Sequence, residues 1–338
     1  MKYLLITFLI FPLAIFSQQE AQIANFSNSP FITNPAAGGL TDVMQFELIG
    51  RTQWIGYNGG PKTLFATGNS QINLGKSTKV LSEYNVKDQS FFAMPEITTG
   101  TTKHIVGGTA YSDAIGPFSR TSITGSYAIH LPFTKKLTFG AGLGLGWSNF
   151  KVNQDRVVLH QTEDDPYSLF LTSTSAQNIL NANGGIVVYN DKLFFSLSTT
   201  QALGNQVVFN TVQTESNFNR HYFAIVKYKV GLNDQFDLEP NIATKLVGNS
   251  PISLDFGSKV IYNQSTWASF QYRTSNSLVM QIGTTLVKNL YFSYSYELSI
   301  AKMATSNTGT HEVLLGFYLG KNRNVDNEIK SNQNTKEE

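Results

Sequence analysis

The feature that most constrains this chain is an alternation of apolar with small or polar residues, repeated in many segments from Asp42 to Gly320. A period of two is the periodicity of a β-strand. In Leu137–Trp147, for example, Leu, Phe, Ala and Trp side chains fall on one face, and Thr and Gly fall on the other. The pattern predicts an all-β fold. It fits both a soluble sandwich, whose apolar face turns inward, and a membrane barrel, whose apolar face meets lipid.

Three further features favour the barrel. The alternating segments run for about 9–12 residues, which is the length of a tilted membrane strand. Tyr, Phe and Trp lie near the segment ends, where membrane interfaces favour them. Charged residues make up only 14% of the chain, against about 25% in soluble domains. We therefore predict an antiparallel transmembrane β-barrel.

The alternating segments number about fourteen, and because a few alternate poorly the count holds to within two. An even number allows a single-chain barrel to close with both ends of its wall in the periplasm. A tight turn is expected at Asn263-Gln264, since Asn is a turn-forming residue. Long connections are expected at Lys76–Thr102, Lys151–Ala182 and Gln201–Asn219.

The two ends of the chain lie outside the predicted wall, residues 42–320. Residues 1–17 combine Lys2, a short apolar run and the small residue Ser17, as in a secretory signal peptide cleaved after Ser17. Residues 18–41 form an irregular segment that is expected to plug the barrel, with a disordered leader as the alternative. Residues 321–338 form a polar tail, either periplasmic or disordered without a role. The predicted location is the outer membrane of a Gram-negative bacterium.

Composition excludes several classes of protein. The chain has no Cys, which rules out a disulfide scaffold and a zinc–thiolate site. Its net charge of +2 is too small to indicate binding to nucleic acid. Ser126 and His130 share a strand face but lie about 13 Å apart, too far for a proton relay. No catalytic residue, metal site or cofactor is predicted.

Three motifs carry a resemblance to a known family. They are Asn34–Gly38, reading N-P-A-A-G, Arg51–Thr63, which includes R-T-Q-W-I-G and ends in P-K-T, and Gly309–Phe317, reading G-T-H-E-V-L-L-G-F. Their types and order resemble the PorP/SprF family of type IX secretion system membrane proteins. The chain departs from many family members in the tail that follows the last strand.

The resemblance implies an outer-membrane β-barrel that acts with the type IX export and gliding apparatus. Family members contact periplasmic ring and motor-associated components. Some are paired with a large secreted adhesin, which they help to export or hold at the cell surface by its C-terminal domain. We expect these partners and outer-membrane lipid for this chain. A passive channel for small solutes is the alternative that a polar lumen alone would favour.

The motifs supply the candidate partner-contact residues: Asn34, Pro35, Arg51, Gln53, Trp54, Pro61, Thr63, His311 and Glu312. The residues around the first turn either dock a periplasmic partner or form a structural turn beside an interfacial Trp54. His311 and Glu312 are either a partner contact or a lumenal pair. They do not form one metal site, because neighbours in a strand point to opposite faces.

Four glycines form a smooth stripe on the face that is predicted to line the lumen: Gly140, Gly142, Gly144 and Gly146. Their spacing is not that of a dinucleotide-binding loop. Either a plug or an exported chain lies close to the wall here, or the glycines allow strand curvature and give room to bulky neighbours.

Overall fold

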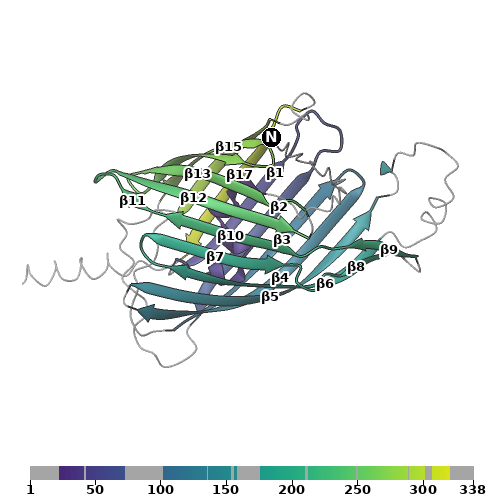
Figure 1. The fold of residues 1–338 in the computed structure, drawn as a ribbon, viewed down its shortest axis with the longest axis horizontal. Helices are drawn as coiled ribbons and strands as arrows, with labels where there is room; N and C mark the ends of the chain where they lie inside the picture. Colours follow the sequence, from purple (N-terminus) through teal and green to yellow (C-terminus); the bar gives the residue numbers. More distant parts are fainter. Residues whose placement is uncertain are drawn as a thin grey trace, which may run out of the picture.

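The computed structural model describes residues 23–319 except 42, 73–101, 135, 154–155, 158–175, 210–211, 249, 288 and 301–306. It shows a closed antiparallel β-barrel, whose strands run obliquely across Figure 1. The wall consists of β1 (Met44–Thr52), β2 (Lys62–Ile72), β3 (Lys103–Ile115), β4 (Phe118–Thr134), β5 (Leu137–Val152), β6 (Ala176–Tyr189), β7 (Leu193–Thr200), β10 (His221–Tyr228), β12 (Phe236–Val247), β13 (Ser253–Tyr262), β14 (Thr266–Arg273), β15 (Ser277–Val287), β16 (Leu290–Ser299) and β17 (Thr310–Leu319). A further strand, β11 (Val230–Gly231), continues β10 along β12, so the 15 strands of the sheet occupy 14 positions (15 − 1). The predicted fourteen-stranded barrel is confirmed.

The barrel closes where the last strand meets the first. In this pair Met44 lies opposite Leu319 at one end, and Thr52 lies opposite His311 at the other. We call the first end the terminal mouth, because the wall begins and ends there. The other end, which carries the first turn at residues 53–61, is called the hairpin mouth.

Side chains of the wall alternate as a membrane barrel requires. On β5, Leu143 and Leu145 are 73% and 75% exposed on the outer surface, whereas Thr138 and Ser148 are buried on the lumenal side. The same inversion holds on the other strands, since the large exposed side chains of the wall are mostly Leu, Ile, Val, Phe and Tyr. The apolar face therefore turns outward to lipid, and the sandwich alternative is excluded.

The turn at Asn263-Gln264 forms as expected. Both residues adopt left-handed backbone conformations, with φ of 47° and 55°. Two successive positive φ values define a type I′ turn, whose twist matches that of the strands it joins. The turn lies at the terminal mouth, together with the short β6–β7 and β15–β16 connections.

One long connection is shorter than expected, and the connection expected at Gln201–Asn219 is as long as predicted but contains a hairpin. β6 already begins at Ala176, and a hairpin of β8 (Gln206–Phe209) and β9 (Val212–Asn217) lies between β7 and β10. The early start of β6 has a physical cause, because its first residues pair beyond the lipid-facing band, where outward side chains need not be apolar. There the exposed Asn149 side chain donates a hydrogen bond of 2.8 Å to Asn178. Periodicity alone does not detect such a strand end.

The predicted signal peptide, its cleavage after Ser17 and the polar tail 321–338 lie outside the described residues, and so does the expected long connection Lys76–Thr102 except for its last residue. Within the described part of the chain, no helix is long and apolar enough to cross a bilayer.

Candidate functional site in the barrel lumen

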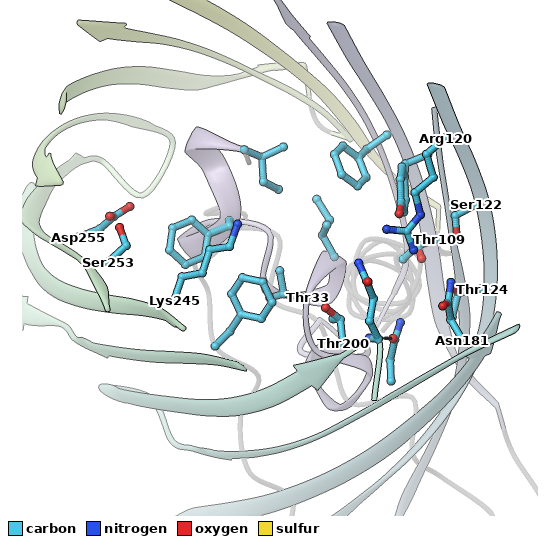
Figure 2. A pocket seen from close by; sticks show the side chains of 18 of the residues that line it. Thr33, Thr109, Arg120, Ser122, Thr124, Asn181, Thr200, Lys245, Ser253 and Asp255 are labelled. Atoms are coloured by element: carbon cyan, nitrogen blue, oxygen red, sulfur yellow. Dashed lines mark hydrogen bonds between the residues drawn. The ribbon is translucent and has the colours of Figure 1, made fainter. Parts of the chain in front are cut away.

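The N-terminal segment lies inside the barrel. Residues 23–41, which we call the plug, are almost all buried, and Figure 2 shows Thr33 near the middle of the lumen with wall strands around it. The plug forms three short 3-10 turns, η1 (Ala24–Ser27), η2 (Pro30–Ile32) and η3 (Pro35–Ala37). Pro30 and Pro35 start η2 and η3, a position where the missing N–H of proline has no consequence.

Glu312 of β17 holds the start of the plug. Its carboxylate accepts hydrogen bonds from the backbone N–H of Ala24 at 2.7 Å and of Asn25 at 2.9 Å. The Asn25 side-chain amide donates a third bond of 2.9 Å to the same carboxylate. Hydrogen bonds to an ionised acceptor are about twice as strong as neutral ones. Glu312 therefore anchors the plug to the seam where the barrel closes.

The same carboxylate belongs to a buried ion-pair network on the wall. Arg51 donates to Glu312 at 3.1 Å and to Glu297 at 2.7 Å. Arg273 in turn bridges Glu297 at 2.9 Å and Asp255 at 2.8 Å. The network thus contains two guanidinium groups and three carboxylates. Apart from Arg51, the donors to Glu312 among the described residues all belong to the plug, so the wall alone does not satisfy this carboxylate.

A second carboxylate contacts the middle of the plug. Glu47 of β1 accepts hydrogen bonds from the hydroxyl of Ser29 at 2.9 Å and from the phenol of Tyr291 at 3.0 Å. On β13, Lys259 pairs with Glu239 at 2.7 Å and donates to the Asn28 side chain at 3.1 Å. Glu47 and Lys259 therefore contact the plug from two different strands of the wall.

The end of the plug is fixed near the terminal mouth. The Asn34 side chain accepts from the N–H of Ala36 at 2.8 Å and donates to the Ser196 hydroxyl at 2.8 Å. It thus caps η3 and ties it to β7. His130 of β4 contacts the carbonyl of Ala36 at 2.8 Å and the phenol of Tyr189 at 3.0 Å.

The glycine stripe on β5 faces the lumen, and its members meet different neighbours. A Cβ at Gly142 would collide with the Pro35–Ala36 backbone, so the plug packs directly against the wall there. At Gly140 the neighbours are the side chains of His130 and Val187, and at Gly144 and Gly146 the neighbour is Thr124. Only Gly142 among the four is thus required by contact with the plug, and the other three give room to wall side chains.

The first-turn candidates lie at the hairpin mouth. The N–H of Gln53 donates to the carbonyl of Pro61 at 2.8 Å, which closes the turn. Trp54 has a left-handed backbone with φ of 53°, donates its N–H to the Thr310 hydroxyl at 3.3 Å, and stacks edge-on with Tyr57. The Thr63 hydroxyl donates to Asp113 at 2.6 Å.

The structure does not gather the candidates into one site. Arg51 and Glu312 meet in the lumen, and Asn34 and Pro35 lie deeper in the plug. His311 points to the outer surface instead, where its ring contacts the Tyr294 phenol at 2.6 Å. His311 and Glu312 therefore do not form a lumenal pair.

The sequence did not reveal Asp255, Arg273 and Glu297, which complete the ion-pair network, or the contacts of Ser196 and His130 with the end of the plug. A weak signal was present, because isolated charges on the polar face of a lipid-facing strand must find a buried partner. Which partner each charge finds depends on barrel register, since Glu312 and Ala24 are 288 positions apart. The described residues contain no group of three or more His, Asp or Glu side chains arranged for a metal ion.

A small cavity lined by both polar and apolar side chains, which we call the vestibule, lies between the plug and the hairpin mouth. Its volume is about 60 Å³, and it opens into a wider space of about 810 Å³ that includes solvent. Ile23, Phe26, Ile32 and Thr33 of the plug form its floor. Figure 2 shows Arg120, Ser122, Thr124 and Asn181 on one side of it and Lys245, Ser253 and Asp255 on the other.

The fold and the polar, plugged lumen define an outer-membrane β-barrel. The family follows from its sequence: the model of the type IX secretion system membrane protein PorP/SprF family matches residues 15–317, so the chain belongs to that family. The family associates the protein with the secretion machinery. A search of curated proteins finds no match.

Solved structures with a similar fold include two hydrocarbon-transporting barrels. The Ralstonia pickettii toluene transporter TbuX is 11% identical, with a TM-score of 0.50 over 86% of this chain and 93% of its own. The monoaromatic hydrocarbon channel CymD is 10% identical, with a TM-score of 0.50 over 89% of this chain and 94% of its own. At such low identity the likeness shows the fold alone.

Proposed function

We propose that this protein assists the export or the surface anchoring of a large secreted adhesin, as an outer-membrane component of the type IX secretion and gliding machinery, and that it contacts periplasmic ring components. The observation that carries the proposal is the family match over residues 15–317. The plug supports it against the alternative of a passive channel, because the plug is bonded to the wall on several sides.

We further propose that the terminal mouth faces the periplasm. The wall begins and ends at this mouth, as in single-chain outer-membrane barrels, whose periplasmic turns are short. Most connections at this mouth are short, such as residues 263–265 between β13 and β14, and the one long connection there is that of residues 73–102 between β2 and β3. In this orientation Gln53, Trp54 and Pro61 face the cell exterior. They then suit a partner held at the cell surface. We propose this contact in place of the periplasmic dock that the sequence suggested.

A deletion strain tests the proposed function. Whole-cell immunolabelling should reveal loss of at least one type IX adhesin from the surface, restored by the gene in trans. Unchanged display of every such adhesin would refute the proposal. Cross-linking followed by pull-down from outer membranes should recover the adhesin and a ring component.

Bilayer conductance separates the channel alternative from the proposed function. The plugged barrel should be silent, whereas a steady open pore would favour a passive channel.

A further inference from the structure

A wide groove lies on the lipid-facing side of the wall, over β10 and β12–β16, and we call it the outer groove. Its volume is about 1,170 Å³, more than the roughly 300–1,000 Å³ of most ligand pockets. Apolar outward side chains such as Phe256 and Phe270 line it, and the small outward residues Pro240, Ser258 and Ala268 leave it room. The groove is therefore an apolar site that opens to the hydrocarbon of the membrane.

The ladder between β10 and β12 is interrupted at one side of this groove. β10 ends at Tyr228, and β11 resumes the pairing at Val230. Both pieces pair with β12 in one register, which places Tyr228 opposite Pro240. In the same register the N–H of Leu232 donates to the carbonyl of Phe236 at 2.9 Å. Because hydrogen-bonded pairs alternate along an antiparallel ladder, the pair of Tyr228 and Pro240 also occupies a hydrogen-bonded position.

Pro240 is the cause of the interruption. Proline has no N–H, so the Tyr228 carbonyl lacks the donor that any other residue at position 240 would supply. Both residues line the outer groove. A backbone carbonyl without a donor is costly in hydrocarbon, where no water replaces the missing partner. The groove thus contains a hydrogen-bond acceptor that the ladder of the wall leaves unused.

The Ser258 hydroxyl is a second unused polar group in the outer groove. Ser258 lies directly opposite Pro240 in the pairing of β12 with β13, and its hydroxyl makes no hydrogen bond among the described residues. By contrast, the outward hydroxyls of Thr266 and Thr284 bond to each other at 2.8 Å. Since neighbouring strands are about 4.8 Å apart, Tyr228 and Ser258 lie roughly 10 Å apart across Pro240. An apolar groove with a few polar groups is the usual character of a small-ligand site.

We propose that the outer groove binds one membrane lipid whose acyl chain carries a hydroxyl group. Lipid is what this surface meets, because the outward side chains around the groove are apolar, as on the membrane face of a barrel. The hydroxyl of the chain donates to the Tyr228 carbonyl, and Ser258 supplies a second contact to an oxygen of the same lipid. An unmodified acyl chain would fill the groove but leave both polar groups unpaired. The backbone N–H groups of a partner's transmembrane helix are already bonded within the helix, so they do not supply the missing donor either.

Native mass spectrometry of the purified full chain in detergent tests the proposal. The probes are 3-hydroxyoctadecanoic acid and 12-hydroxyoctadecanoic acid, with octadecanoic acid as the control. We expect one hydroxylated acid to be retained about ten-fold more than the control, which is the value of one neutral hydrogen bond. Pro240→Ala supplies an N–H to the Tyr228 carbonyl, so the preference for the hydroxyl should be lost. Pro132→Ala, in β4 on another part of the wall, is the matched control and should keep the preference.

A second substitution tests the groove without altering the ladder. Ala268→Leu places a larger side chain where the lipid chain lies, so retention of all three acids should fall several-fold. Ala110→Leu makes the same change on β3, outside the outer groove, and should leave retention unchanged.

Equal retention of hydroxylated and plain acids by the native chain would overturn the proposal, and so would a preference that survives Pro240→Ala. An equal loss in Ala268→Leu and Ala110→Leu would show that the acids bind elsewhere. Ser258→Cys introduces a single thiol into the groove, because the chain has no Cys. If that thiol cross-links to another protein in outer membranes, the groove belongs to a membrane-embedded partner and the lipid assignment is wrong.

Discussion

Glu312 should control how firmly the plug is held. Its carboxylate accepts three hydrogen bonds from the plug, at 2.7, 2.9 and 2.9 Å. It also pairs with Arg51, which is itself only 3% exposed. Glu312→Ala removes all three plug contacts and leaves Arg51 with Glu297 as its remaining ion-pair partner in the described network.

The expected magnitude follows from these contacts. The Arg51–Glu312 ion pair joins two wall strands, so its loss affects the plugged and the open state alike. The loss that falls on the plugged state alone is that of two or three hydrogen bonds to a charged group, at about 1.5–3 kcal/mol each. Since about 1.4 kcal/mol is a factor of ten, plug opening should increase roughly a hundred-fold or more.

Cysteine labelling measures this opening, because the native chain has no Cys. Ser27→Cys places a single thiol on a plug residue that is 2% exposed. When opening and reclosing are fast, the maleimide labelling rate follows the open population. Asp191→Ala, an exposed carboxylate in the β6–β7 turn, is the control. If Glu312→Ala labels no faster than this control while the circular dichroism spectrum stays unchanged, the assigned role of Glu312 is wrong.

Three further substitutions follow from the same contacts. Gly142→Val should displace the plug and raise labelling of the plug thiol, whereas Gly125→Val, which meets no atom within 4 Å, should leave labelling unchanged. His130→Phe should raise labelling about ten-fold, since it removes hydrogen bonds to the plug carbonyl and to a phenol, each worth about 0.5–1.5 kcal/mol. Leu143→Arg should lower the free energy of unfolding in vesicles by about 2–4 kcal/mol, and Phe133→Arg near the end of β4 by about 0–1 kcal/mol. Equal losses at these two positions would contradict the assigned membrane depth.

The sequence predicts the wall well because its signal is local. Each strand must present apolar side chains to lipid at every second residue, so β5 is recognisable without knowledge of its neighbours. The prediction weakens where that requirement ends. At the start of β6, Asn178 pairs with Asn149 beyond the apolar band, and the alternation no longer marks the strand.

The lumenal site is much less predictable, because its contacts join residues that are far apart in sequence. Arg51 is 261 positions from Glu312 and 246 from Glu297. These pairs exist only because β17 closes onto β1 in one register. A change of that register by one residue would turn Glu312 outward to lipid. The motifs mark Arg51 and Glu312 as candidate contact residues, yet only the closed barrel explains why the two side chains meet.

The distribution of charge indicates that plug and wall form a single folding unit. The network contains three carboxylates against two guanidinium groups, and Glu47 accepts from four side chains, none of which is cationic. Such an excess of buried acceptors is costly unless donors are supplied. The plug supplies them through the N–H groups of Ala24 and Asn25 and the Ser29 hydroxyl. A barrel built for an open pore would have no need of acceptors aimed at its own N-terminal segment, so releasing the plug requires either water or another polypeptide to take over these bonds.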